Sequence, residues 1–569
     1  MTALSYDAAY DVAAVVLVVV ATVGIGIYGL RLARTTSDFL VASRAVSPTW
    51  NAAAIGGEYL SAASFLGVAG LVFVYGADAL WYPVGFVAGY LVLLLLVAAP
   101  LRRSGAYTLP DFAEIRLGSR GVRRLCSALV VAVSWLYLVP QLQAAGLTLR
   151  ATTGAPLWVG GTVVAVVVVL NVAGGGMRSV TYVQAFHYWL KLTALAVPAL
   201  LLVLAWQAAG QPALAGPGPP VFPDRTTVQL DRAVTITVVQ PVEAQLPGAA
   251  ARRLEPGPTD LPAGTVLRFD AGAPVPHAQP LAASTGDDWQ QPLAGAGGRE
   301  HPLYATYALV LATFLGTMGL PHVLVRFYTN PDGRSARRTT LAVVGLLGLF
   351  YLLPAVYGAL GRHYTPELLL TGRTDAVVLA LPSAVIGGIT GQLLEALLVA
   401  GAFAAFLSTS SGLLVSTAGV LVQDVLGGSV RDFRRATVFA GAIPLAVALL
   451  AADLPVAQVV GLAFAVAAST FCPLLVLGIW WRGLTAVGAA AGLVVGGGLS
   501  IFAVLFTLSG RAADGWAAAL LAQPAAWTVP TAFIVMIGGS LLTRRHRPAD
   551  VARTMLQLHA PESLGLAGR

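Results

Sequence analysis

The sequence predicts an all-α polytopic membrane protein with about thirteen transmembrane helices and one small β-rich insert outside the cytoplasm. Of its 569 residues, 57% are hydrophobic and only 11% are charged, whereas an average soluble domain has about 25% charged residues. Apolar runs of about 18 or more residues recur along the chain, and each is long enough to cross a hydrocarbon core of about 30 Å. This composition excludes an ordinary soluble enzyme and a disordered chain.

The thirteen predicted helices share the length and apolar character of a membrane span. They cover residues 12–30, 50–75, 78–101, 125–149, 156–173, 184–207, 302–328, 339–360, 391–424, 436–452, 455–480, 485–508 and 526–543. Segment 376–390 is apolar but short, and it predicts a re-entrant or surface helix. The first segment lacks a basic start and a small-residue cleavage site, so we expect a retained helix and not a signal peptide.

The arginines predict the orientation of the chain. The sequence has 33 arginines and one lysine, Lys191, a bias that we interpret as genomic composition. Arginines gather in loops 31–48, 102–124, 329–338 and 425–435 and in the tail 544–569. With thirteen crossings these segments lie on one side, which is the cytoplasm by the positive-inside rule. The N-terminus is then outside and the C-terminus inside, and the net charge of +8 does not indicate a nucleic-acid partner.

Residues 208–301 interrupt the helical pattern and divide the chain. They are rich in Pro, Gly, Asp and Gln, and the alternating runs 235–239 and 265–269 predict strands between turns. We expect a passive or partner-contacting role for this insert, with capture of substrate as the alternative. The predicted parts are 1–207 (first repeat 50–207), 208–301, 302–543 (second repeat 302–480) and the cytoplasmic tail 544–569.

Two predicted helices carry breaks at matching positions. The second helix contains Gly56 and Gly57, and the seventh contains Gly316, Gly319 and Pro321. Irregular backbone inside a membrane is tolerated where it lines a cavity or is buried in protein, although such residues also serve helix packing or kinks. Each break opens a run of five helices. Because five is odd, the second run starts from the opposite side of the membrane, which predicts a five-plus-five inverted repeat of a transporter.

Glu58 is the acid that the sequence places at mid-membrane depth. An intramembrane carboxylate indicates function by default, and the alternative is a buried acid that holds the break in shape. We expect no arginine at this depth. A small anion would therefore bind to N–H groups of the half-helices together with a tyrosine or glutamine.

The ninth helix carries adjacent hydroxyl groups that suggest a cation site. Ser408 and Thr409, with the carbonyl of Ala405 one turn earlier, place three oxygens at one level. By analogy with other hard cations, Na⁺ prefers about five or six oxygen ligands, and the break in the second helix could supply the rest. Hydroxyls that bond to their own helix are the alternative, and spacing alone favours it.

Several segments resemble the sodium:solute symporter family. Residues 37–44 and 175–181 resemble its general motifs, and residues 57–67, 316–327 and 406–414 resemble its cation/acetate symporter branch. The resemblance covers about residues 35–480 apart from the insert. Glu58 stands where the branch usually has Asp.

The resemblance implies a leucine-transporter-like fold and two binding sites. It places Na⁺ on the carbonyls of Gly57, Leu60 and Ala405 and on the hydroxyls of Ser408 and Thr409. It places the solute between the second, fourth and seventh helices. The residues expected to face the solute are Glu58, Tyr59, Tyr137, Gln141, Gln143, Thr317 and Met318.

We therefore expect a secondary active symporter of the cell membrane that couples Na⁺ entry to uptake of a short-chain monocarboxylate such as acetate, propionate or pyruvate. The alternatives are proton coupling through Glu58, Na⁺ symport of an amino acid or sugar, and a membrane solute sensor, which the short tail 544–569 disfavours. No nucleophile–base pair or phosphate-binding loop points to an enzyme. The expected partners are Na⁺ or H⁺, a small organic anion and the lipid bilayer, with no resident cofactor.

Overall fold

The structure is a computed structural model of the chain. It describes residues 8–32, 36–216, 218–230, 233–247, 252–278, 286–293, 301–426, 429–451, 456–509, 511 and 513–561. Arg34 of the first arginine loop and residues 562–569 of the predicted tail lie outside these ranges.

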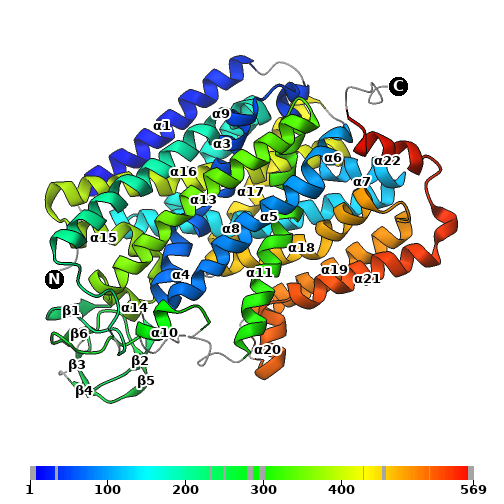
Figure 1. Ribbon diagram of the computed structural model, residues 1–569. Coiled ribbons are helices and arrows are strands. Elements are labelled where there is room, and N and C mark those ends of the chain that lie inside the picture. Colours follow the sequence, from blue (N-terminus) through cyan, green and yellow to red (C-terminus); the bar gives the residue numbers. More distant parts are fainter. Residues whose placement is uncertain are drawn as a thin grey trace.

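The helices of the membrane spans and of α3 pack side by side into one bundle (Figure 1). They include α1 (Ala8–Leu32), α3 (Pro48–Tyr59), α4 (Val68–Tyr75), α5 (Trp81–Val92), α8 (Arg120–Thr153), α9 (Leu157–Ala208), α11 (Pro302–Gly319), α13 (Gly333–Tyr364), α16 (Gly388–Leu421), α17 (Val430–Leu450), α18 (Val456–Trp480), α19 (Ala486–Leu508) and α21 (Ala525–Leu542). The other α-helices are α2 (Thr36–Val41), α6 (Ala98–Arg103), α7 (Leu109–Leu117), α10 (Gly286–Gln290), α12 (Pro321–Val325), α14 (Glu367–Thr371), α15 (Val377–Val385), α20 (Gly515–Ala522) and α22 (Val551–His559).

Eleven spans in the described part of the chain are long and apolar enough to cross a membrane. The span Leu157–Ala208 holds two of the thirteen predicted helices, and the span Ala63–Arg103 holds the predicted helix 78–101 and the second part of 50–75, whose first part lies in α3. The span Leu157–Ala208 has 52 residues, more than twice the roughly 20 that one crossing needs, and it bends at Gly176, whose φ is +56°. The span Ala63–Arg103 turns at Gly76, whose φ is +62°. The eleven spans therefore agree with the predicted segments.

The two helix breaks have different outcomes. The second lies where it was predicted, because α11 ends at Gly319, Leu320 is extended and α12 begins at Pro321. The first lies beyond Gly56 and Gly57, which are inside α3.

In the first break, α3 ends at Tyr59 and Leu60 leaves the helix with φ −75° and ψ 83°. The chain resumes as a π-helix, η2 (Ala63–Gly67). Gly57 serves packing and not the break, because a Cβ there would lie 2.0 Å from the carbonyl oxygen of Gln184 in α9.

The insert contains the predicted strands. They are β1 (Thr226–Gln229), β2 (Val234–Val238), β3 (Val242–Gln245), β4 (Arg252–Leu254), β5 (Gly257–Leu261) and β6 (Val266–Phe269). Four form an antiparallel sheet in the order β1-β6-β3-β4, and β2 pairs with β5. Both sheets lie at one end of the bundle, and α22 lies near the opposite end (Figure 1).

A tryptophan after the sheets holds this part of the chain to the bundle. Trp289 of α10 is buried, and its indole N–H points at the carbonyls of Val72 and Phe73 in α4, at 3.1 and 3.2 Å. The Arg362 guanidinium of α13 lies 5.6 Å from the centre of its ring, within cation–π range.

Candidate functional site

An ion pair joins the two broken helices. Glu58 lies in the last turn of α3, and its Oε2 accepts a hydrogen bond from Nε of Arg326 at 2.6 Å. Arg326 follows α12 in the 3₁₀ segment η6 (Arg326–Thr329), and its Nη1 donates to Thr181 Oγ1 of α9 at 2.8 Å. The side chains of Glu58 and Arg326 are 1% and 0% exposed.

The expectation that no arginine lies deep in the protein is therefore wrong. The predicted helix 302–328 placed Arg326 near its cytoplasmic end, beyond the predicted break. The break at Leu320 and the short α12 instead bring it back to Glu58.

The structure brings the five residues expected to bind Na⁺ together where α3 meets α16. Thr409 Oγ1 donates to the carbonyl of Glu58 at 2.6 Å, and Ser408 Oγ donates to the carbonyl of Ala405 at 3.2 Å. The oxygens of Gly57, Leu60 and Ser408 all accept hydrogen bonds from the ammonium group of Lys191 in α9.

Sequence reasoning missed Lys191. The signal was present, since it is the only lysine of the chain and lies within an apolar segment. An ionisable residue in such a segment indicates function by default. The interpretation of the lysine count as genomic composition overlooked this position.

Polar side chains surround the first break. Thr317 Oγ1 donates to the carbonyl of Thr313 at 2.7 Å, so the hydroxyl of Tyr59, 2.7 Å from Thr317 Oγ1, is the donor of that pair. Tyr137 donates to Ser61 Oγ at 3.1 Å, inside the break. The amide oxygen of Gln141 accepts a hydrogen bond from the backbone N–H of Ala62 at 3.1 Å.

Three buried polar groups near this break have no hydrogen-bond partner among the described residues. They are Nε2 of Gln141, both ring nitrogens of His322 and the hydroxyl of Tyr90. The ring of His322 lies 5.5 Å from that of Tyr137, and the ring of Tyr90 lies 5.0 Å from that of Tyr59. Buried polar groups ordinarily find partners, and these atoms are exceptions to that rule among the described residues. His322 and Tyr90 were not among the predicted residues.

The last two predicted solute-facing residues are Gln143 and Met318. Gln143 is turned toward α17, where its Nε2 donates to the carbonyl of Ala448 at 3.1 Å. Met318 is fully buried in the last turn of α11. Gln143 therefore stands apart from the polar side chains of the break.

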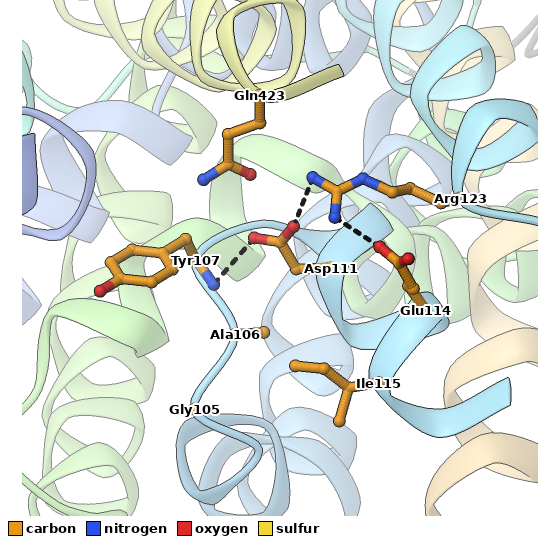
Figure 2. A pocket seen from close by; sticks show the side chains of 8 residues that line it. All are labelled: Gly105, Ala106, Tyr107, Asp111, Glu114, Ile115, Arg123 and Gln423. Carbon is orange, nitrogen blue, oxygen red and sulfur yellow. Dashed lines mark hydrogen bonds and ion pairs between the residues drawn. The ribbon is translucent and has the colours of Figure 1, made fainter. Parts of the chain in front are cut away.

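A charged pocket of about 580 Å³ lies elsewhere, between α7, α8 and the π-helical end of α16, η8 (Val422–Leu426). The Arg123 guanidinium contacts Asp111 at 2.8 Å and Glu114 at 2.6 Å (Figure 2). Arg123 also pairs with Asp424 of η8. Burial raises the pKa of the Asp111 carboxyl, although Arg123 beside it acts in the opposite direction. This network holds the end of the helix that carries Ser408 and Thr409 to α7 and α8.

Two interrupted helices that meet through buried charges inside a membrane bundle define a secondary transporter. The model of the sodium:solute symporter family matches residues 39–214 and 281–496. The chain belongs to this family, whose members are transporters of solutes and not enzymes. Its eleven candidate spans agree with a multi-pass membrane protein.

Curated relatives cover most of the chain. A monocarboxylic acid transporter of Corynebacterium glutamicum is 29% identical over 558 residues, which cover 92% of this chain and 90% of that protein. The uncharacterized symporter YwcA of Bacillus subtilis is 28% identical over 480 residues, 82% of this chain and 80% of that protein.

Solved structures confirm the fold. A Na⁺-coupled sialic acid symporter in a substrate-bound outward-open state has a TM-score of 0.63 at 13% identity, covering 94% of this chain and 98% of that one. Mhp1, a nucleobase-cation-symport-1 family transporter in a closed conformation, has a TM-score of 0.53 at 12% identity, covering 91% and 98%. The predicted leucine-transporter-like fold is thereby confirmed.

Proposed function

We propose that the protein takes up a short-chain monocarboxylate, such as acetate, propionate or pyruvate, in symport with a cation. The observation that carries this proposal is the buried charge beside the first break. Two basic side chains and one acid lie in this cluster: Arg326 pairs with the Glu58 carboxylate, and Lys191 donates to the carbonyls of Gly57 and Leu60 on either side of it in the chain. With all three side chains ionised, the cluster has one net positive charge. A bound monoanion would neutralise this charge, whereas a neutral sugar would leave it uncompensated in a medium where isolated charges are costly.

The unpartnered groups supply donors for such an anion. The Gln141 amide and the Tyr90 hydroxyl are neutral donors, and a neutral His322 carries one further ring N–H. A carboxylate offers two oxygens that accept about four hydrogen bonds. The relative in Corynebacterium glutamicum, a monocarboxylic acid transporter, supports the same class of solute.

The driving cation is the second part of the proposal. Membership of the family implies Na⁺, and H⁺ is the alternative. A monocarboxylate moving with one monovalent cation is electroneutral, so the gradient of that cation would supply the driving force and the membrane potential would contribute only if further cations move.

Uptake of labelled acetate into proteoliposomes tests the solute. We expect unlabelled propionate and pyruvate to compete with acetate, and proline and glucose to leave its uptake unchanged. Gln141→Ala should raise the KM for acetate about tenfold or more, because a hydrogen bond to a charged group contributes about 1.5–3 kcal/mol. Gln143→Ala, two positions along the same helix, is the matched control. Competition by proline or glucose but not by propionate would contradict the proposal.

A further inference from the structure

Lys191 lies at the centre of the cluster in which the family places its cation. It is fully buried and shares one face of α9 with Gln184 and Thr181, since separations of seven and three residues return to the same side of a helix. Gln184 Nε2 donates to the carbonyl of Ser408 at 2.7 Å, and Thr181 accepts from Arg326. This face of α9 therefore contacts both α16 and the segment after α12.

The ammonium group is fully coordinated. Its Nζ lies 2.5 Å from the carbonyl oxygen of Gly57, 2.7 Å from that of Leu60 and 3.1 Å from Ser408 Oγ. A lysine ammonium has three N–H donors and no acceptor, so each donor has one oxygen. The carbonyls of Gly57 in α3 and of Leu60 just after it lack helical N–H partners, because the N–H groups of Ser61 and Ser64 donate to the carbonyls of Tyr59 and Ser61 instead.

The same oxygens cannot hold Na⁺ at the same time. Three of the five expected Na⁺ ligands already accept from Lys191, and the hydroxyl of Thr409 donates to the carbonyl of Glu58. A metal ion bound by these oxygens would lie within a few ångströms of the ammonium nitrogen, where two like charges repel strongly in a low-dielectric interior.

The surrounding charges do not offset this repulsion. The carboxylate of Glu58 is paired with Arg326 at 2.6 Å, so with Lys191 as an ammonium the described cluster already has one net positive charge. Adding Na⁺ would make it two. The residues present therefore do not fit a metal ion at this position.

We propose that Lys191 is the cation of this site. Its tethered ammonium takes the place that the family gives to Na⁺, holds α9 to the break of α3 and to α16, and makes this site unable to bind Na⁺. Lys191 is thus the residue that determines cation specificity here. This inference deepens the proposed function: what Lys191 does for transport rests on the proposal that the protein takes up a monocarboxylate.

Thermal unfolding of the purified full-length protein tests the site without any solute. Tm is measured in NaCl and in choline chloride of equal ionic strength, because an ion that binds the native state raises Tm with its concentration. We expect wild type and Lys191→Arg to show the same Tm in both salts. Lys191→Ala removes the ammonium, so Na⁺ can bind in its place. The Tm of this variant should therefore rise with Na⁺ concentration. Ser408→Ala added to Lys191→Ala should abolish that increase.

Two results would overturn the proposal. One is a Na⁺-dependent Tm increase in wild type that Ser408→Ala removes. The other is a folded Lys191→Ala protein whose Tm ignores Na⁺. If Lys191→Ala does not fold in either salt, Lys191→Gln replaces it, because the amide keeps hydrogen-bond donors and lacks the charge.

The transport assay separates this inference from the proposed function. We expect wild-type acetate uptake to be equal in NaCl and in choline chloride at matched pH and membrane potential. Acetate uptake that requires Na⁺ and is lost in Ser408→Ala would contradict the role of Lys191 and leave the monocarboxylate proposal standing. Absence of acetate uptake in every condition would contradict the monocarboxylate proposal alone, since the unfolding measurement does not depend on it.

Discussion

Glu58 and Arg326 depend on each other because both lie in the protein interior. Each side chain is at most 1% exposed, and Nε of Arg326 lies 2.6 Å from Oε2 of Glu58. Removing two charges from water is costly, and their attraction and hydrogen bonds offset that cost only while both are present. The pair therefore joins the segment after α12 to the end of α3 more firmly than a surface ion pair would.

Arg326→Ala should destabilise the protein by about 3–5 kcal/mol, because it leaves the Glu58 carboxylate buried without a partner. Adding Glu58→Gln should restore part of the loss, since it removes the orphaned charge. The measurement is Tm and the monodisperse fraction in detergent. Arg225→Ala is the control, because the Arg225–Asp270 pair is 84% and 85% exposed and such pairs contribute about 0–1 kcal/mol. Equal stability of the two arginine variants would contradict this reading.

Among single residues, the sequence analysis singled out one member of the charge cluster, Glu58, and missed the other two, Arg326 and Lys191. Glu58 stood out because a carboxylate inside an apolar segment is unusual. Arg326 looked like the end of a helix, and its burial depends on the path of the chain after Leu320. The role of Lys191 depends on which carbonyls the first break leaves open. Both are long-range consequences of packing, which no local pattern contains.

The two breaks show that glycine in a predicted helix can mark either a break or a close contact with a neighbouring helix. Gly319 and Pro321 flank an extended Leu320, as their residue types predict. Gly56 and Gly57 remain helical, and their lack of a side chain admits a neighbour, because a Cβ at Gly56 would lie 2.7 Å from the ring of Tyr188. For the first break, the sequence thus identified the helix that breaks but not the residue at which it breaks.

Gly57→Ala should be strongly destabilising. A Cβ there would lie 2.0 Å from the carbonyl oxygen of Gln184, and forcing α3 away from α9 costs about 1–3 kcal/mol or more. Gly461→Ala in α18 is the matched control, because nothing lies within 4 Å of its added Cβ. In an exposed helical position, alanine is favoured over glycine by about 1 kcal/mol. Tm measured in detergent should fall for Gly57→Ala and stay level or rise for Gly461→Ala. An unchanged Tm for Gly57→Ala would contradict the close contact between α3 and α9.

The insert illustrates what alternation alone can predict. The runs 235–239 and 265–269 coincide with β2 and β6, because period-two patterning is a local property. The pairing of β1 with the distant β6 and the docking of Trp289 onto the end of α4 depend on tertiary contacts that this pattern does not specify.

Across the whole molecule, the charged network of Arg123 and the β-sheet insert belong to opposite sides of the predicted membrane. The network lies in the arginine-rich loop 102–124 and at the end of α16. The insert follows α9 after an even number of predicted crossings and docks on the end of α4 through Trp289. By the positive-inside rule the side with the Arg123 network is cytoplasmic. The predicted orientation can therefore be tested at two places, the arginine-rich loops and the insert.

Cysteine labelling in intact cells tests this orientation. Arg253→Cys in β4 and Arg334→Cys in the first turn of α13 place single thiols at exposed positions on the two predicted sides. The background should be low, because the native Cys126 and Cys472 are both buried. A membrane-impermeant maleimide should label the residue-253 variant directly and the residue-334 variant only after the membrane is permeabilised. The reverse pattern would place the insert in the cytoplasm and would mean that the arginine loops do not set the orientation of this chain.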